Sequence, residues 1–108
     1  MNEMTLKEVC IAIGVSRRAV QGYEKAGLVS YTRKNSKGYL LYDKDAQERI
    51  KMIRLYQKLG FSIKQIQNII DAPREMLQSA LKECIKKLEK QKEEIAILIE
   101  LANQLLTL

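Results

Sequence analysis

The spacing of apolar residues predicts a short helix near the N-terminus. Thr5 and Glu8 form a capping box, in which each side chain binds the backbone N–H of the other residue at the start of a helix. Apolar residues then recur at helical spacing, namely Leu6, Val9, Cys10 and Ile13. Gly14 follows the last of them and predicts the end of this helix, because glycine readily adopts the left-handed backbone conformation found there.

A second helix is expected directly after this break. Ser16 is a favoured N-cap residue, the helix is expected to run to about Lys25, and Gly27 marks its end. Two short helices joined by a tight turn form a helix-turn-helix pattern. The interior of the second helix is unusual, because Gly22 weakens the helix and is followed at once by Tyr23.

The next residues predict a β-hairpin and two more helices. Tyr31, Leu40 and Tyr42 flank the polar residues 35–38, a pattern typical of two strands joined by a turn. Asp43 then caps a helix that is expected to end at about Leu59. A second capping box, formed by Ser62 and Gln65, begins a short helix that carries four isoleucines.

Pro73, the only proline, is the predicted boundary between a first domain of residues 1–72 and a second of residues 73–108. The second domain contains no helix breaker and predicts a helix of about 35 residues, roughly 52 Å long. Its apolar residues follow a heptad. The a positions are Leu81, Leu88, Ile95 and Ala102, and the d positions are Leu77, Cys84, Gln91, Leu98 and Leu105. This seam predicts a homodimeric coiled coil with Gln91 fixing the register, and packing of the helix onto its own first domain is the alternative.

The charge of the chain is concentrated in the first domain. Residues 1–72 contain 13 Lys/Arg and 7 Asp/Glu, a net charge of +6, whereas residues 73–108 contain 6 of each. This asymmetry favours a polyanionic partner, although a basic surface without a partner is the alternative. The chain has two cysteines and no histidine, so we expect no metal site, no cofactor and no catalytic triad. It has no apolar segment long enough to span a membrane and no signal segment, so we expect a cytoplasmic protein.

A duplex DNA partner explains the residue types on the second helix. Arg17 and Arg18 lie in its first turn, where base edges in the major groove are usually contacted, and Gln21 lies one turn later on the same face. We interpret Gly22 as clearance for the DNA backbone and Tyr23 as a phosphate anchor. The alternative is that the glycine is a tolerated weakness and the tyrosine packs in the core. The hairpin tip, with Arg33, Lys34 and Lys37 and no acidic residue of its own, is similar to a wing that grips the backbone.

Three ordered motifs resemble those of the MerR family of transcription regulators. They are GVSRRAVQGYEKAGL from Gly14, GYLLY from Gly38 and LGFSIKQIQNII from Leu59. The resemblance covers residues 5 to about 71, and the family also places a coiled-coil helix after them. It implies a mostly α fold: a winged helix-turn-helix with a small β-hairpin wing, followed by a long C-terminal coiled-coil helix. Independently of the resemblance, we expect no enzymatic activity, because no nucleophilic side chain has a plausible general base and the acidic cluster of Asp43, Asp45 and Glu48 is typical of a helix N-terminus.

The resemblance further implies a homodimer, joined through an antiparallel coiled coil, that binds a near-palindromic promoter operator in double-stranded DNA. Distortion of that DNA would alter transcription by RNA polymerase, with an effector tipping the balance. The residues expected at the DNA are Ser16, Arg17, Arg18, Gln21, Tyr23, Arg33, Lys34, Lys37 and Tyr39. The residues expected in the core are Leu6, Val9, Ile13, Val15, Val20, Leu28 and Phe61.

The chain departs from the family pattern at several positions. Gln21 replaces the usual arginine before the paired aromatic residues, and Gly22 replaces the first of those aromatics. Leu40 replaces the arginine of the wing motif, and Gln57 stands where a second arginine often follows Arg54. These changes remove up to three expected DNA contacts, so the operator preference is expected to be the chain's own.

Two other functions remain open at this stage. An architectural, excisionase-like DNA-binding protein would share the winged helix, but a long coiled coil that sets the spacing of two half-sites argues against it. A coiled-coil interaction protein could use its basic head to bind an acidic partner. Binding to duplex DNA that is sequence-selective and falls steeply with salt would support the regulator over this interaction protein.

Overall fold

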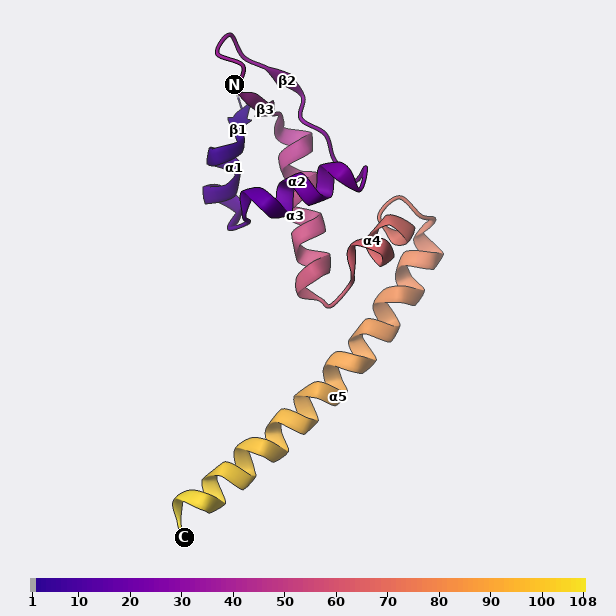
Figure 1. Ribbon diagram of the computed structural model, residues 1–108. Coiled ribbons are helices and arrows are strands. Elements are labelled where there is room, and N and C mark those ends of the chain that lie inside the picture. Colours follow the sequence, from indigo (N-terminus) through magenta and orange to yellow (C-terminus); the bar gives the residue numbers. More distant parts are fainter. Residues whose placement is uncertain (1) are drawn as a thin grey trace. The chain divides into compact units, whose positions relative to one another are not determined.

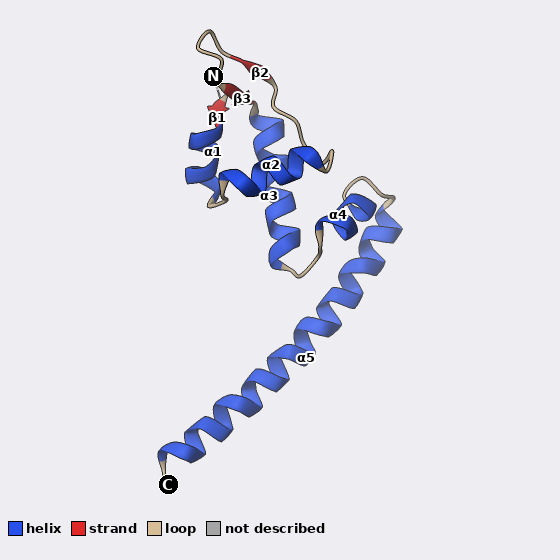
Figure 2. Cartoon of the chain, in the orientation of Figure 1, coloured by secondary structure: helices blue, strands red, loops and turns tan. Residues whose placement is uncertain are grey.

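The computed structural model describes residues 2–108, which divide into two compact units. The first ends at Asp71 and is called the globular unit below; the second runs from Ala72 to Leu108. The described part of the globular unit contains four helices and three short strands, and the second unit contains one long helix (Figure 1). The fold is therefore mostly helical, with a small sheet beside a helix-turn-helix, as predicted (Figure 2).

The helices of the globular unit begin at the predicted caps. They are α1 (Leu6–Ile13), α2 (Arg17–Lys25), α3 (Lys44–Lys58) and α4 (Ile63–Ile69). Both capping boxes are present: Thr5 pairs with Glu8 at α1, and Ser62 pairs with Gln65 at α4. Gly14 has a φ of 75° and donates its N–H to Cys10 O, which ends α1 in the left-handed conformation expected of a glycine.

Three short strands form an antiparallel sheet. They are β1 (Met4–Thr5), β2 (Arg33–Lys34) and β3 (Leu40–Tyr42), in the order β1-β3-β2. The predicted hairpin is confirmed as β2 and β3, with Lys34 opposite Leu40. The third strand, in which Met4 pairs with Tyr42, was not predicted, because two residues are too few to show the alternation of a strand. This strand ties the start of α1 to the base of the hairpin.

The core of the globular unit draws on every helix and on β3. Of the predicted core residues, Val9, Val15, Val20 and Leu28 are buried, whereas Leu6, Ile13 and Phe61 are only half-buried. The largest side chains that are fully buried are Tyr23, Tyr42, Ile50, Ile53, Ile66, Val9 and Val20. Packing of these residues holds α2 against α3 and fixes which face of α2 points outward.

The second unit is the helix α5 (Arg74–Leu106), 33 residues long. It begins after Pro73, as predicted, but no side chain caps its first turn. Cys84 is buried, while the seam residues Ile95, Leu98 and Leu105 are 56%, 62% and 67% exposed. A helix of this length therefore presents a row of unburied apolar side chains along its C-terminal half. None of the helices in residues 2–108 is long and apolar enough to cross a membrane.

Candidate nucleic-acid interface

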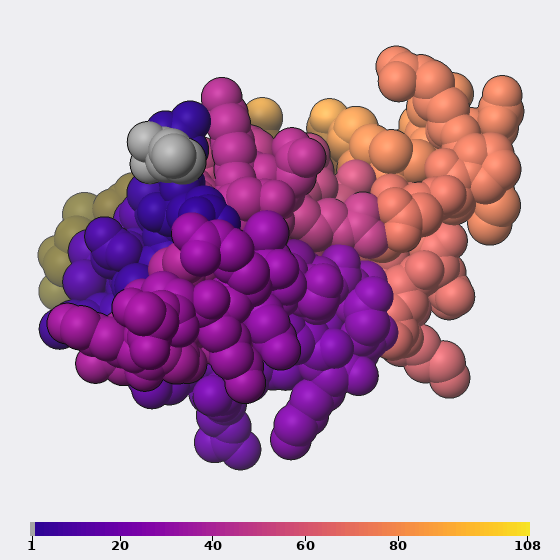
Figure 3. All heavy atoms as spheres, turned by 90° about the horizontal axis from the view of Figure 1, so that it is seen from above, coloured from indigo at the N-terminus to yellow at the C-terminus, as the bar shows by residue number. Residues whose placement is uncertain are grey.

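The amphipathic character of α2 separates its core face from its outer face. Val20 and Tyr23 point into the core, whereas Arg17, Arg18 and Gln21 are exposed. Residues 16–23 contain no acidic side chain, and neither arginine side chain forms a hydrogen bond with another described residue. In Figure 3, long side chains from the violet stretch that contains α2 stand out from the globular unit. The first turn of α2 thus carries two unneutralised cations.

Ser16, the first of the expected DNA-binding residues, has a structural task in this arrangement. Its Oγ accepts a hydrogen bond from the backbone N–H of Ala19 at 3.0 Å, which caps α2. The cap fixes the direction in which Arg17 and Arg18 leave the helix start. Its hydroxyl remains exposed at the surface.

An open groove of about 520 Å³ brings the start of α1, the outer face of α2 and the wing together. Arg17 and Gln21 form its α2 side. The remaining lining residues are Thr5, Leu6, Lys7, Gly38, Tyr39 and Leu40. Sequence reasoning placed Arg17, Gln21 and Tyr39 at the interface but missed Lys7, whose place in the groove depends on how α1 packs.

The wing tip is held in shape by Asn35. Its side-chain Oδ1 accepts hydrogen bonds from the backbone N–H groups of Lys37 and Tyr39, at 2.9 and 3.0 Å. Gly38 has a φ of 82°, a conformation that favours glycine, and its N–H donates to Asn35 O. The turn leaves Lys34, Lys37 and Tyr39 exposed beside the groove. The sequence signal for this arrangement is the asparagine three residues before a glycine.

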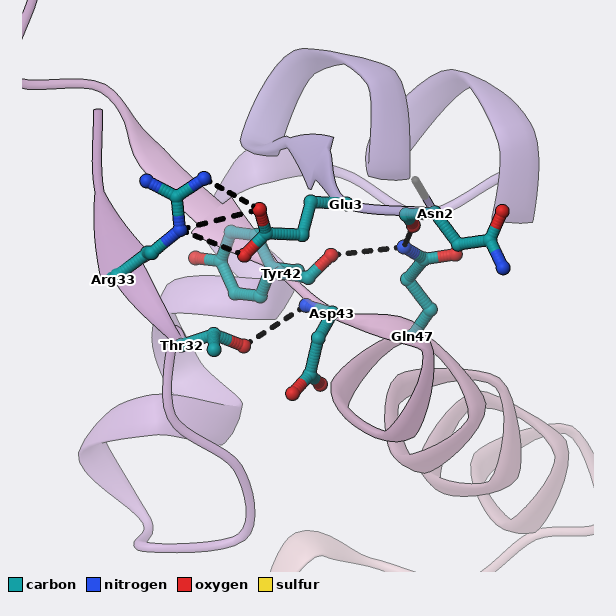
Figure 4. A network of polar contacts seen from close by, with 7 residues as sticks. All are labelled: Asn2, Glu3, Thr32, Arg33, Tyr42, Asp43 and Gln47. Atoms are coloured by element: carbon teal, nitrogen blue, oxygen red, sulfur yellow. Dashed lines mark hydrogen bonds and ion pairs between the residues drawn. The ribbon is translucent and has the colours of Figure 1, made fainter. Parts of the chain in front are cut away.

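The base of the wing is tied to the N-terminal residues by a polar network (Figure 4). The guanidinium of Arg33 donates to both carboxylate oxygens of Glu3, at 2.6 to 3.2 Å. Gln47 donates from its side-chain amide to the carbonyl oxygens of Asn2 and Tyr42. The hairpin tip has no acidic residue of its own, as the sequence shows, but Glu3, which lies 30 positions before Arg33 in the sequence, meets it in the fold.

Tyr23 is not an exposed anchor, and the structure corrects this expectation. Its side chain is 1% exposed, and its hydroxyl donates to Oε1 of Gln57 at 2.5 Å. Burial raises the pKa of the Tyr23 hydroxyl, and the positive charge of Arg54 partly opposes that shift. Tyr23 therefore links α2 to α3, and Gln57, which stands in for an arginine, is the residue that satisfies it.

A second buried tyrosine fixes the other end of α2. The Tyr42 hydroxyl donates to Oε1 of Glu24, and burial followed by this carboxylate raises the pKa of Tyr42 well above its usual range. Glu24 is thereby committed to the contact between α2 and β3.

Within residues 2–108, no group of three or more His, Cys, Asp and Glu side chains could hold a metal ion.

Comparison with known families decides what this arrangement belongs to. The model of the MerR HTH family regulatory protein matches residues 4–73, which span α1 to α4 and the wing. The chain belongs to the MerR family. A second model of this family, described as MerR, DNA binding, matches residues 47–107 and so extends through α5. The first model describes a regulatory protein, and the second describes a DNA-binding region.

Individual known proteins are similar to most of this chain. The nodulation protein NolA of Bradyrhizobium sp. (strain NC92) is 31% identical over 84 residues, which are 78% of this chain and 35% of NolA. The crystal structure of MtaN, the N-terminus of the Bacillus subtilis multidrug transporter activator, is 26% identical with a TM-score of 0.71, covering 95% of this chain and 97% of that one. Its match to NolA thus spans about a third of the length of that protein.

A third structure is more distant in sequence and supports the fold alone. HiNmlR, a MerR family regulator lacking the sensor domain and bound to promoter DNA, is 19% identical with a TM-score of 0.75. The match covers 91% of this chain and 79% of HiNmlR.

The departures of this chain from the MerR pattern fall on two kinds of position. Gln21 and Leu40 both line the groove, one from α2 and the other from β3. Gln57 lies behind the outer face, bonded to Tyr23. The first two substitutions change the chemistry of the candidate interface, whereas Gln57 serves the packing of α2 on α3.

Proposed function

We propose that the chain is a sequence-specific DNA-binding transcriptional regulator, with residues 1–72 as its DNA-binding domain. The observation that carries the proposal is the groove lined jointly by Arg17 and Gln21 of α2 and by Gly38 and Tyr39 of the wing. A helix inserted in the major groove and a loop on the adjoining backbone require this proximity. The net charge of +6 on residues 1–72 supports a polyanionic partner.

The exposed residues divide by role. Arg17, Arg18 and Gln21 would meet base edges, because they are exposed in the first two turns of α2. Lys34, Lys37 and Tyr39 of the wing would bind phosphates, and Lys7 in the groove joins this set. Arg33 contributes less, because Glu3 neutralises its charge.

We further propose that residues 73–108 form a homodimer through an antiparallel coiled coil. The seam comprises Leu77, Leu81, Cys84, Leu88, Gln91, Ile95, Leu98, Ala102 and Leu105. The exposure of Leu88 and of every seam residue after it supports this proposal, since a row of apolar side chains on a helix about 50 Å long needs a partner. Two DNA-binding domains held at a fixed distance would bind a near-palindromic operator.

The mechanism would be distortion of promoter DNA so that RNA polymerase uses the promoter differently. HiNmlR, which shares the fold of this chain, is bound to promoter DNA in its structure, and promoter DNA is the partner that we propose to test here. Bending or untwisting a duplex costs on the order of a few kcal/mol, so an effector or the sequence of the operator would decide how far the DNA is distorted.

Binding of the purified chain to a selected operator and to unrelated duplexes, measured across a range of salt concentrations, tests the proposal. We expect a steep fall in affinity with salt and a clear preference for the operator. Arg18→Ala should weaken operator binding by about 1–3 kcal/mol and change unrelated duplexes less, if Arg18 meets a base. Arg74→Ala, which removes an exposed arginine from α5, is the control. Equal loss on every duplex would make Arg18 a phosphate contact, and salt-insensitive binding would contradict the proposal.

A further inference from the structure

Gln21 is the one glutamine of the globular unit whose side chain has no hydrogen-bond partner in the described structure. The side-chain amides of the other four, Gln47, Gln57, Gln65 and Gln67, all form hydrogen bonds. Gln21 is exposed and lines the groove one turn after Arg17. Its amide therefore keeps both its donor and its acceptor available for a bound molecule.

The residue after Gln21 points to close approach at the same place. Gly22 lies in the interior of α2, where glycine weakens a helix relative to alanine. Its φ is not positive, and a Cβ added to it would meet nothing within 4 Å. Neither the backbone conformation nor the packing of the chain thus requires a glycine. Open space directly beside an unpartnered amide is what a closely docked duplex would fill.

Different side chains on the outer face of α2 recognise different base edges in the major groove. Adenine presents a paired acceptor and donor, N7 and N6–H₂, which match the donor and acceptor of a glutamine amide. Guanine presents two acceptors, N7 and O6, which match the donors of an arginine. We propose that Gln21 selects an adenine in each half-site of the operator. This inference rests on the proposed function and adds the identity of one base.

A library of duplexes with randomised half-sites tests the inference, with enrichment by the full chain and by three variants. The wild-type chain should enrich adenine at one position of each half-site. Gln21→Met, which keeps the length of the side chain but removes its amide, should lose this preference by on the order of tenfold and keep the preferences at other positions. Gln21→Arg should change the preferred base at that same position to guanine. Gln104→Arg, an exposed site on α5, is the charge-matched control and should leave every preference unchanged.

The outcomes separate the inference from the function on which it rests. Enrichment of one operator with the same base preferences in all four proteins would overturn the role of Gln21 and leave the regulator intact. Failure of the wild-type chain to enrich any duplex would overturn both. Thermal melts of each variant establish that the fold is retained, which is expected because Gln21 is exposed and makes no contact through its amide to another described residue.

Discussion

Tyr23 and Gly22 are neighbours on α2 with opposite environments. Tyr23 is buried and is held by Gln57, whereas Gly22 is exposed and has open space where a Cβ would lie. The sequence suggested that both served one DNA contact. The structure separates them, because a rotation of about 100° along the helix turns one residue toward α3 and the other outward. Of these two residues, only Gly22 is still predicted to act at the DNA, as clearance for its backbone.

Gly22→Ala tests that interpretation at a single residue. Alanine should stabilise the globular unit by roughly 0.5–1 kcal/mol, since it favours the helix and its Cβ meets no other atom within 4 Å. The same change should weaken operator binding if the duplex closely approaches α2 here. Chemical denaturation and operator affinity together measure the two effects. A variant that is more stable and binds equally well would mean that Gly22 is a tolerated helix weakness.

At the scale of the element, the wing is positioned by residues outside its hairpin. Strand β1 pairs with β3, and Glu3 on its N-terminal side holds the guanidinium of Arg33. Arg49 of α3 similarly joins segments that are distant in the sequence. Its guanidinium donates to Leu28 O and to both carboxylate oxygens of Asp71. These ties connect the ends of the elements, where short strands and helices have few contacts of their own.

Glu3→Gln measures what the tie to Arg33 does for DNA binding. The amide keeps a hydrogen-bond acceptor beside Arg33 but removes the charge that neutralises it, so the wing would gain one free cation. We expect tighter binding to duplex DNA and a salt dependence steeper by up to about 0.9 in the logarithmic slope. Fluorescence anisotropy over a salt series gives both quantities.

The control for this prediction is Glu48→Gln. Glu48 forms an exposed ion pair with Lys51 on α3, so the variant makes the same change of charge without touching the wing. An equal gain in both variants would show that net charge alone is responsible. A loss of affinity in Glu3→Gln would instead assign Glu3 the role of positioning the wing.

At the scale of the whole molecule, the two units have different sources of stability. The globular unit buries its own core within one chain, whereas α5 leaves Ile95, Leu98 and Leu105 more than half exposed. Burying apolar surface stabilises by roughly 25 cal/mol per Å², so such a row favours association with a partner. The proposed dimer would supply this burial and would also set the distance between the two DNA-binding domains.

Leu88→Glu tests the dimer at an a position of the seam. A charge buried against the partner helix should shift the chain toward monomers and reduce operator affinity, because the two half-sites would then be bound independently. Sedimentation equilibrium determines the oligomeric state, and operator binding is measured in parallel. Ser79→Glu places the same charge at an exposed position outside the seam and should change neither property. A Leu88→Glu dimer of undiminished stability would refute the assigned heptad.

Much of this protein is determined by its sequence alone, because the interactions concerned are local. Helix starts depend on a hydroxyl or carboxylate and the N–H three residues later, so Thr5, Ser16, Asp43 and Ser62 could be identified as caps before any fold was known. The heptad of α5 repeats within one helix in the same way. These features place the starts of α1 to α4 and the long helix that follows Pro73.

The tertiary structure decides what distant residues do to one another. Tyr23 lies 34 positions from Gln57, and Arg33 lies 30 positions from Glu3, so no local spacing could reveal either contact. Tyr23 lies in the core and bonds to Gln57, away from the expected interface. The contact of Arg33 with Glu3 reduces the free positive charge of the wing. Burial and charge neutralisation are properties of the packed chain, and they determine which of the predicted residues remain available to DNA.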